Sequence, residues 1–551
     1  MSTLTALADR YVDDLAALDP CMAATMGIAG QEARLTDYGP DGDAARTELR
    51  RRTLAELDEI AAARPPGEVT AADRIAEAML RERLETEIAL AESRARATLL
   101  DTTEGPINLL RQAIELLDQG AETPWEVMHS RLLGLPDALT QVRAGLEVAR
   151  GDGLVAARRQ VRRNVQACMN APAYLSGLAD GAPDERVRDA VAHANQALTD
   201  LAGYLGDVLM PIAPERDALG RDRYALGVRD YLGTRLDLEE TYAWGWEELA
   251  RIEAEMAAIA GEIRPGASVA EVTAALDADP AYRISGAEEF RAYLQELADQ
   301  AIADLDGVHF DIPEALRRID CRIPPTESGI YYYAPAEDLS RPGTVWWSVP
   351  ESGPDAATWT VPGVMFHEGV PGHHLQLGVT TLNTSRLNRF QRLSSELHPG
   401  HAEGWGLYAE RLMDELGFYR EPAHRLGMLA NGQQLRAARV VLDIGLHLEL
   451  PIPAGTGFHE GERWNAELGR EFLALHCGRD SAAFVNYEID RYLGRPAQAI
   501  AYKVGERVWL AARDAVRRRE GSAFDLKEFH RDALDLGPMG LDLLRRELVE
   551  A

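Results

Sequence analysis

The amino-acid sequence predicts a mainly α-helical protein of two lobes, with a deep cleft and a small β-sheet at its edge. Its 551 residues exceed the roughly 250–300 residues that one hydrophobic core usually serves, so we expect two lobes. Apolar residues recur every three or four positions through most of the chain, as in amphipathic helices. Residues 322–350 differ, because aromatic and β-branched residues alternate there between prolines and glycines, a pattern typical of short strands.

The first lobe is expected to cover residues 1–215 and to be helical. Stretches such as "AADRIAEAMLRERLETEIALAESRA" are rich in Ala, Leu, Glu and Arg, which favour helices. Proline and glycine cluster at residues 64–69, 181–185 and 210–220, where we expect the helices to break. The last cluster is the predicted boundary between the lobes.

The second lobe is expected to cover residues 216–551 and to carry both the sheet and the chemistry. Helices continue through "LEETYAWGWEELARIEAEMAAIAGEI", give way to the strands of residues 322–350, and resume from Pro362 onwards. The strand "GTVWWSV" is expected to pair with an extended peptide. A candidate metal site follows at residues 362–410.

Charge and hydropathy exclude several classes of protein. The chain has 89 acidic and 58 basic residues, and its net charge of −31 would repel nucleic acid and anionic lipid. No apolar run approaches the roughly 18 residues of a membrane span, and the N-terminal sequence lacks the pattern of a signal peptide. We therefore expect a cytoplasmic monomer or homodimer that binds neither nucleic acid nor membranes.

The stretch "FHEGVPGHHLQLG" combines three histidines and a glutamate with a Pro-Gly pair. In the H-E-x-x-H helix of zinc hydrolases, two histidines share one helical face and bind the metal. Here the fourth residue after His367 is Pro371, which cannot donate to the carbonyl of His367 and clashes with it. The helix is therefore expected to kink or end in this turn. Glu368 stands where the general base of such a site would be.

The second histidine ligand is then His373 or His374. On an unbroken helix, seven residues rotate by about −20°, so His374 would return to the face of His367, about 10 Å further along the axis. A looped-out Gly-Val-Pro-Gly segment would instead bring His373 to the metal and leave His374 as a neighbouring or substrate contact. A third interpretation is a histidine-rich helix start whose imidazoles bind the backbone. Spacing alone leaves this choice open.

A glutamate from a second helix is the expected third ligand. In "ELHPGHAEGWGLYAERLMDELGF", Glu403 and Glu410 share one helical face, and Glu403 lies near the helix start. Glu403 is the predicted ligand, and Glu410 is interpreted as a solvated or salt-bridged residue. His398 and His401 are alternative ligands, although beside a Pro-Gly pair they are expected to cap the helix.

A polar stripe crosses the otherwise apolar helix "LRAARVVLDIGLHLEL". The polar side chains fall within about 80° of one another on a helical wheel: Arg436, Arg439, Asp443 and His447. Buried polar groups need a partner or a ligand, so the stripe is expected to line an internal cleft. Arg436 or Arg439 would hold a substrate carboxylate, and His447 would stabilise the transition state or orient the site. A structural ion pair between Arg439 and Asp443 is the alternative.

The segment "RYLGRPAQAIAYKVG" supplies two further candidates. Tyr502 would donate a hydrogen bond to a developing oxyanion. A packed tyrosine with a satisfied hydroxyl is the alternative. Gln498 is a candidate substrate contact from the same segment.

These motifs together resemble the "domain of unknown function 885" family, which is placed among the zinc metallopeptidase superfamilies. The resemblance covers most of the chain, and its motifs are "HEGVPGHHLQ", "AEGWGLYAE", "RAARVVLDIGLH" and "RPAQAIAYKVG". The first motif is highly specific, since H-E-x-x-P-G-H is rare outside that family. The resemblance implies a fold similar to that of the carboxypeptidase Taq group and the wider helical gluzincins.

The resemblance also implies roles for individual residues. It makes His367, His373 and Glu403 the metal ligands and Glu368 the general base. Relatives often lack a histidine at the position of His374, which favours His373 as the second ligand.

The sequence departs from the family pattern at Ile444 and Ala497, where relatives typically read D-T-G and P-G-Q-A. These departures concern substrate contacts and leave the metal site unchanged. The predicted function is a zinc-dependent hydrolase that cleaves amide or peptide bonds of short peptides, with metal-activated water and Glu368 as base. The alternatives are a metal-dependent hydrolase or lyase of a small non-peptide amide, and a non-enzymatic helical binding protein.

Overall fold

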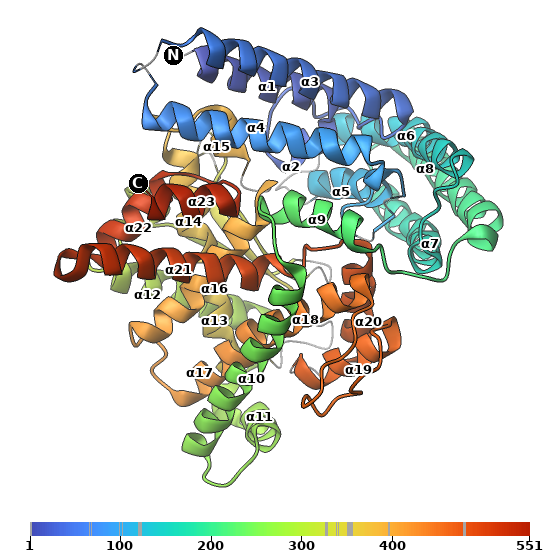
Figure 1. The fold of residues 1–551 in the computed structure, drawn as a ribbon. Helices are drawn as coiled ribbons and strands as arrows, with labels where there is room; N and C mark the ends of the chain where they lie inside the picture. Colours follow the sequence, from blue (N-terminus) through green and yellow to red (C-terminus); the bar gives the residue numbers. More distant parts are fainter. Residues whose placement is uncertain are drawn as a thin grey trace. The chain divides into compact units, whose positions relative to one another are not determined.

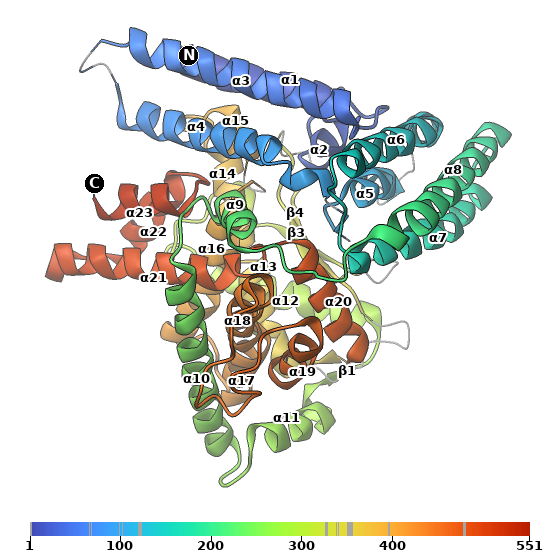
Figure 2. The ribbon, with the colours of Figure 1, turned by 45° about the vertical axis from the view of Figure 1, so that its right-hand side comes forward.

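A computed structural model describes residues 3–550 except 66, 68, 99, 102, 119–123, 325–328, 338, 340, 350–355, 395, 396 and 478–480. The chain divides into two compact units (Figures 1 and 2). Unit 1 comprises Met1–Leu226 and Asn486–Pro496, and unit 2 comprises Gly227–Val485 and Ala497–Ala551. Each unit is therefore built from two separate stretches of sequence.

Within its described residues, unit 1 contains helices and no strands. Its helices, of which α9 and α20 extend into unit 2, are α1 (Thr3–Leu18), α2 (Pro20–Thr25), α3 (Pro40–Ala63), α4 (Ala71–Glu92), η1 (Ala95–Thr98), α5 (Pro106–Asp118), α6 (Trp125–Gly151), α7 (Arg158–Asp180), α8 (Glu185–Tyr204), η2 (Leu205–Leu209), η3 (Met210–Ile212), α9 (Arg221–Leu232) and α20 (Ala482–Gly494). Helices α1, α3 and α4 lie side by side, as do α7 and α8 (Figures 1 and 2). The three predicted helix breaks are confirmed, since two follow the ends of α3 and α7 and the third, which contains the short η3, lies between η2 and α9.

The core of unit 1 lies among α5, α6, α7 and α8, where Leu110, Leu132 and Val161 are fully buried. The returning segment Asn486–Pro496 is held to α7 through Asp490. Gln160 Nε2 on α7 donates to the backbone oxygen of Asp490 at 3.0 Å, and two α7 arginines bind the Asp490 carboxylate. These bonds attach α20 to unit 1.

Unit 2 is also mainly helical. Its helices are α10 (Leu238–Ile263), α11 (Val269–Ala278), η4 (Pro280–Tyr282), α12 (Ala287–Leu305), η5 (Glu314–Leu316), η6 (Thr358–Thr360), α13 (Val361–Glu368), α14 (His373–Leu382), α15 (Arg389–Leu393), α16 (Pro399–Glu415), α17 (Pro422–Gly427), η8 (Met428–Gln434), α18 (Leu435–Leu448), α19 (Ala466–His476), α21 (Ala501–Glu520), η9 (Gly521–Ala523), α22 (Leu526–Asp535) and α23 (Leu541–Val549). Helix α16 packs along α21, and α10 packs along α18. A Cβ atom at Gly404 would lie 2.5 Å from the backbone of Gly505, so glycines permit the close approach of α16 and α21.

Two small sheets complete unit 2. Strand β1 (Arg283–Ile284) pairs antiparallel with β5 (Ala356–Ala357). In the second sheet, the order is β2 (Ile319–Arg322), β4 (Gly343–Trp347), β3 (Ile330–Tyr333). The predicted strand region thus contains β3 and β4, although residues 325–328, 338, 340 and 350 of that region lie outside the described ones.

The place of β4 in this sheet corrects one expectation. It pairs in parallel with β2 and antiparallel with β3, with Ile319 opposite Gly343 and Tyr332 opposite Val345. Both backbone edges of β4 are therefore occupied. The expectation that "GTVWWSV" pairs with an extended peptide is wrong.

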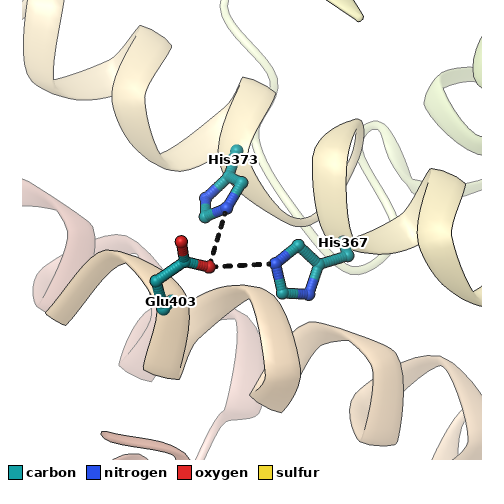
Figure 3. A group of neighbouring side chains, drawn as sticks. All are labelled: His367, His373 and Glu403. Atoms are coloured by element: carbon teal, nitrogen blue, oxygen red, sulfur yellow. Dashed lines mark hydrogen bonds and ion pairs between the residues drawn. The ribbon is translucent and has the colours of Figure 1, made fainter. Parts of the chain in front are cut away.

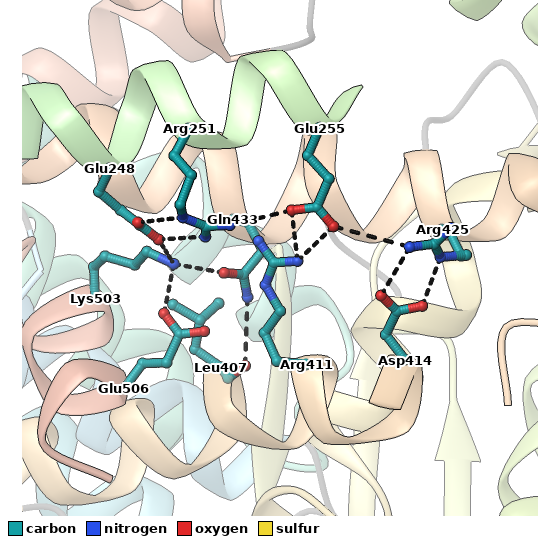
Figure 4. A network of polar contacts seen from close by, with 10 residues as sticks. All are labelled: Glu248, Arg251, Glu255, Leu407, Arg411, Asp414, Arg425, Gln433, Lys503 and Glu506. Carbon is teal, nitrogen blue, oxygen red and sulfur yellow. Dashed lines mark hydrogen bonds and ion pairs between the residues drawn. The ribbon is translucent and has the colours of Figure 1, made fainter. Parts of the chain in front are cut away.

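A network of charges, buried at Lys503 and Glu506 and exposed at Arg251, connects α10, α16, α17, η8 and α21 (Figure 4). Lys503, only 1 % exposed, lies at one end, and its Nζ donates to Gln433 Oε1 at 2.5 Å and contacts Glu248 Oε1 at 2.9 Å. The Lys503 Nζ also binds Glu506, and Gln433 Nε2 donates to the backbone oxygen of Leu407 at 3.4 Å. The network continues through Arg251, Glu255, Arg411, Asp414 and Arg425 (Figure 4). It fixes α16 and η8 relative to the start of α21.

None of the described helices is long and apolar enough to cross a membrane.

Candidate metal centre

The helix that carries the first histidine of the motif ends shortly before Pro371, as the proline predicts. Helix α13 ends at Glu368, α14 begins at His373, and the cis peptide bond before Pro371 lies between them. A Cβ atom at Gly372 would lie 1.9 Å from the carbonyl oxygen of His367, so the tight turn needs glycine there. Trp405 on α16 donates from Nε1 to the carbonyl oxygen of Pro371 at 2.8 Å. The predicted break in the helix is confirmed.

This turn brings three side chains together (Figure 3). The Nε2 atom of His367 lies 3.2 Å from Oε2 of Glu403, and Nε2 of His373 lies 3.5 Å from the same oxygen. The two imidazole rings are 4.8 Å apart and nearly perpendicular, at 89°. Among the residues that the structure describes, these three form the group of potential ligands whose donor atoms all lie within 4.8 Å of one another.

Charge and burial show that this group fits a cation. Both histidines are buried and Glu403 is partly exposed, so the group is open on the side of the carboxylate. Burial lowers the pKa of His367, but hydrogen bonds with Glu403 and Glu410 outweigh burial and raise that pKa to about 10. Burial raises the pKa of Glu403, but hydrogen bonds with His367 and His373 outweigh it and hold the pKa well below its ordinary value. The carboxylates thus stabilise positive charge at this group. Two imidazoles and one carboxylate are also a donor set that suits Zn²⁺.

Glu410 is a site residue that the sequence interpretation missed. His367 Nδ1 donates to Oε1 of Glu410 at 2.8 Å, and Glu410 is only 2 % exposed. The bond leaves Nε2 of His367 to face Glu403 and His373, as in metal sites where a carboxylate orients a histidine ligand. Of the two expectations for Glu410, solvation is wrong, because its face of α16 packs on α13, and an ionic partner is confirmed in His367. The signal for this role was its spacing from Glu403, which places both carboxylates on one helical face.

His374 lies outside this group. Its Nε2 donates to the backbone oxygen of Leu316 at 2.9 Å, and its Nδ1 accepts from the hydroxyl of Tyr332 at 2.9 Å. The side chain is fully buried, and burial lowers its pKa to about 4. Both ring nitrogens are thus occupied by protein groups, and His374 joins α14 to β3 and η5.

The alternative histidine ligands also lie outside the group. His398 is the N-cap residue of α16, as expected, but its side chain makes no capping hydrogen bond. His401 is buried on the first turn of α16, where its Nδ1 accepts from Nε2 of Gln376 at 3.0 Å. Burial lowers the pKa of His401 to about 3, so this imidazole is neutral and joins α14 to α16.

Glu368 is the last residue of α13 and follows His367 directly. Its side chain is partly exposed, and among the described residues none forms a hydrogen bond with its carboxylate. Burial raises the pKa of Glu368, while the charges of His367 and His373 act against that rise. The geometry therefore leaves a carboxylate beside the ligand group that is free to accept a proton.

Tyr502 and two arginines lie next to this group. The Tyr502 ring, on the first turn of α21, is 6.3 Å from the His367 ring and inclined to it by 26°. The guanidinium carbon of Arg436 lies 5.3 Å from the centre of the Tyr502 ring, and that of Arg439 lies 5.1 Å from it. The structure thus brings three predicted site residues together beside a predicted ligand.

The end of the polar stripe is buried beside a loop. His447 and Asp443 are fully buried, with His447 Nε2 3.9 Å from Asp443 Oδ1. The backbone N–H of Ala497 donates to Oδ2 of Asp443 at 2.7 Å, and Gln498 is buried next to it. Ala497 has a φ of 72°, a conformation that favours glycine. The structure places His447 beside Asp443.

Comparison with known proteins shows the family and the fold. The model of a family described as "Bacterial protein of unknown function (DUF885)" matches residues 20–548. The crystal structure of a "putative lipoprotein" from Colwellia psychrerythraea is similar with a TM-score of 0.81 and 19% identity, over 99% of this chain and 98% of that one. A "putative lipoprotein of unknown function" from Shewanella oneidensis is similar with a TM-score of 0.73 and 15% identity, over 100% of both chains. At such identities the likeness shows the fold alone. No curated protein matches the sequence.

Proposed function

Because the chain belongs to the DUF885 family of bacterial proteins, whose function is unknown, we propose a function from its own site: a zinc-dependent hydrolase of amide bonds in short peptides. The observation that carries the proposal is the convergence of two imidazole Nε2 atoms on one carboxylate oxygen, with Glu368 next to the first histidine. Two histidines and one glutamate are the ligands of a large class of catalytic zinc sites that keep a further position open.

His367, His373 and Glu403 would hold the ion. When bound, zinc supplies Lewis acidity that polarises a carbonyl group and lowers the pKa of water. Glu368 takes the proton from the attacking water and passes it to the leaving nitrogen, a role that suits a carboxylate whose pKa is raised by burial. Tyr502 donates a hydrogen bond to the carbonyl oxygen as negative charge develops on it.

His447 and Gln498 have supporting roles in this proposal. His447 orients the polar stripe from its buried place beside Asp443. Gln498 contacts the substrate from the loop that Asp443 holds. A relation to the carboxypeptidase Taq group and the helical gluzincins is part of the proposal, and the four sequence motifs support it. The cytoplasmic location and the monomeric or homodimeric state stay predictions.

The test is turnover of a dipeptide library by the zinc-loaded protein and its Glu368→Gln variant. We expect kcat to fall by about 10²–10⁴-fold in the variant, with zinc content unchanged, because the proton acceptor is lost. Glu296→Gln, an exposed change on α12, is the matched control and should retain full turnover. Unchanged turnover in Glu368→Gln would overturn the proposal. Small amidated metabolites in the same screen separate a peptidase from a hydrolase of non-peptide amides.

A further inference from the structure

Gln433 is a fully buried glutamine on η8, and both ends of its amide are hydrogen-bonded. Its Oε1 accepts from Nζ of Lys503 on α21 at 2.5 Å, and its Nε2 donates to the backbone oxygen of Leu407 on α16 at 3.4 Å (Figure 4). A glutamine amide carries an acceptor and a donor, so it can connect an ammonium group with a carbonyl group. Gln433 and its two partners thus form a link between three elements.

The α16 end of this link borders the candidate metal centre. Leu407 directly follows Gly406, and a Cβ atom at Gly406 would lie 2.7 Å from Nε2 of His367. The ring of this predicted ligand therefore lies directly on the helix backbone, where only glycine leaves room for it. The hydrogen bond from Gln433 holds α16 one residue away from this contact.

The η8 member of the link borders the carboxylate that orients the same ligand. Gln433 directly follows Gly432, whose backbone lies against the carboxylate of Glu410. That carboxylate accepts from Nδ1 of His367 at 2.8 Å. If η8 shifted away from α16, the carboxylate could move away from the imidazole. The hydrogen bonds of Gln433 oppose this shift, because they hold η8 to both α16 and α21.

The α21 end of the link also has a neighbour at the metal centre. Lys503 directly follows Tyr502 on the first turn of α21, and the Tyr502 ring is 6.3 Å from the ring of His367. Lys503 is only 1 % exposed and is held by Gln433 and by two glutamates. All three members of the link therefore come directly after a residue that borders His367 or its carboxylate.

We propose that Gln433 is a positioning residue of the metal centre: its amide holds η8, α16 and the start of α21 together and thereby fixes the orientation of the His367 imidazole. It acts indirectly, through Glu410 and through the backbone of α16. A metal ligand must be held within a few tenths of an ångström and about 10–20° of its working geometry, so small shifts of these elements weaken the bond to the ion. The inference rests on the proposed function, because it concerns the same metal centre.

The test compares zinc binding by Gln433→Met and Gln434→Met in the full chain. Methionine is similar in size to glutamine and forms neither hydrogen bond of the link. Gln434 is the matched control, because it is the next residue of η8, is also buried, and donates from Nε2 to Oε1 of Glu253 on α10 at 3.0 Å. Competition with a chelator should give a zinc affinity about 10-fold lower in Gln433→Met, because the ligand is less well oriented. The affinity of Gln434→Met should equal that of the wild-type protein.

The cobalt-loaded protein supplies a second measurement, since the visible absorption bands of Co²⁺ report the geometry of its ligands. The bands should shift in Gln433→Met and stay in place in Gln434→Met. Gln433→Glu keeps an acceptor for Lys503 and loses the donor to Leu407, so its zinc affinity should lie between those of Gln433→Met and the wild-type protein. This variant also covers the case in which Gln433→Met does not fold.

The possible results distinguish this inference from the proposed function. Wild-type zinc affinity and cobalt bands in both Gln433 variants would overturn the inference. Equal losses of affinity in Gln433→Met and Gln434→Met would overturn it as well, because the effect would then be common to all of η8. A wild-type protein that binds zinc and cleaves no dipeptide would overturn the proposed function alone. A wild-type protein that binds no metal would overturn both.

Discussion

Gly432 and Glu410 approach so closely that a Cβ atom at position 432 would lie 1.9 Å from Oε2 of Glu410. The backbone of η8 therefore lies directly on the carboxylate that binds His367. This short π-helical segment is a local departure from α-helical geometry, of a kind that often occurs at functional sites. The close approach leads to the first prediction.

Gly432→Ala should displace the Glu410 carboxylate and weaken its bond to His367. We expect a loss of about 1–3 kcal/mol in the free energy of unfolding, as for other changes that overpack a buried site. Zinc affinity should fall as well. Chemical denaturation and zinc titration measure the two effects. Gly261→Ala is the matched control, since a Cβ atom there would meet nothing within 4 Å. A Gly432→Ala protein as stable as wild type would contradict the prediction.

Glu410→Gln should weaken zinc binding without removing a ligand. The amide is neutral and binds the Nδ1–H of His367 less strongly than a carboxylate does, so the imidazole becomes a poorer metal ligand. Loss of such an orienting carboxylate typically lowers metal affinity by about 10–100-fold. Competition with a coloured chelator measures the affinity. Glu415→Gln, which alters the pair with Arg513 at the end of α16, should leave zinc affinity unchanged. Equal affinities in all three proteins would refute the role of Glu410.

Metal content should distinguish the two adjacent histidines. Mass spectrometry of the purified protein should find about one zinc per chain, lost in His367→Ala and in His373→Ala. In His374→Gln the zinc should remain, because both ring nitrogens of His374 bind protein groups. In that variant the free energy of unfolding should instead fall, by the contribution of about one or two buried hydrogen bonds. Loss of zinc in His374→Gln would contradict the assignment of His373.

Replacement of the two lysines of the chain should reduce stability to very different extents. Lys503→Met would leave the buried Glu506 without its cation, which typically costs about 3–5 kcal/mol, while Glu248 would keep Arg251 as a partner. Lys527→Met removes a partly exposed ion pair with Asp311 and should cost less than about 1 kcal/mol. Urea unfolding of the two variants gives the comparison. Similar losses in both would contradict a central role for the network in Figure 4.

The buried His530 predicts loss of stability in mild acid. Its Nε2 accepts from the Tyr408 hydroxyl at 2.6 Å, and burial lowers its pKa to about 3. In the unfolded chain that pKa is about 6.5, so the unfolded state binds the extra proton first. Stability is therefore full above pH 6.5 and falls as the pH drops from about 6.5 toward 3, by up to about 1.4 kcal/mol per pH unit.

Urea unfolding between pH 7 and pH 5 tests this prediction. In His530→Gln, which does not titrate, the dependence of the unfolding free energy on pH should be shallower than in the wild-type protein. His193→Gln, an exposed change on α8, should keep the wild-type dependence. An unchanged slope in His530→Gln would show that this imidazole does not titrate on unfolding.

The end of α13 could be predicted from sequence because its cause is local. Pro371 lacks the N–H that a helix needs and its ring collides with the preceding turn, whatever the rest of the chain does. The choice of His373 over His374 has a distant cause. It depends on the path of the Pro-Gly turn, which Trp405 holds from another helix, so spacing alone could not decide it.

Other features could be predicted only with knowledge of which surfaces pack against one another. The seven-residue spacing of Glu403 and Glu410 fixes a common helical face, but only the packing of α16 on α13 shows that this face is buried. The strand segments could likewise be recognised from their residues, whereas the central place of β4 depends on a parallel pairing with β2. Hydrophobic pattern sets which side of an element is apolar, and it does not name the neighbour.

Because Asn486–Pro496 belongs to unit 1, that unit cannot be completed until late in the synthesis of the chain. Synthesis proceeds from the N-terminus, so residues 1–226 emerge long before Asp490. Until then, Arg163 and Arg159 lack the Asp490 carboxylate that they bind in the finished protein, and Arg159 has only Asp217 as an acidic partner. The first unit to begin folding is thus completed only after most of the second has been made.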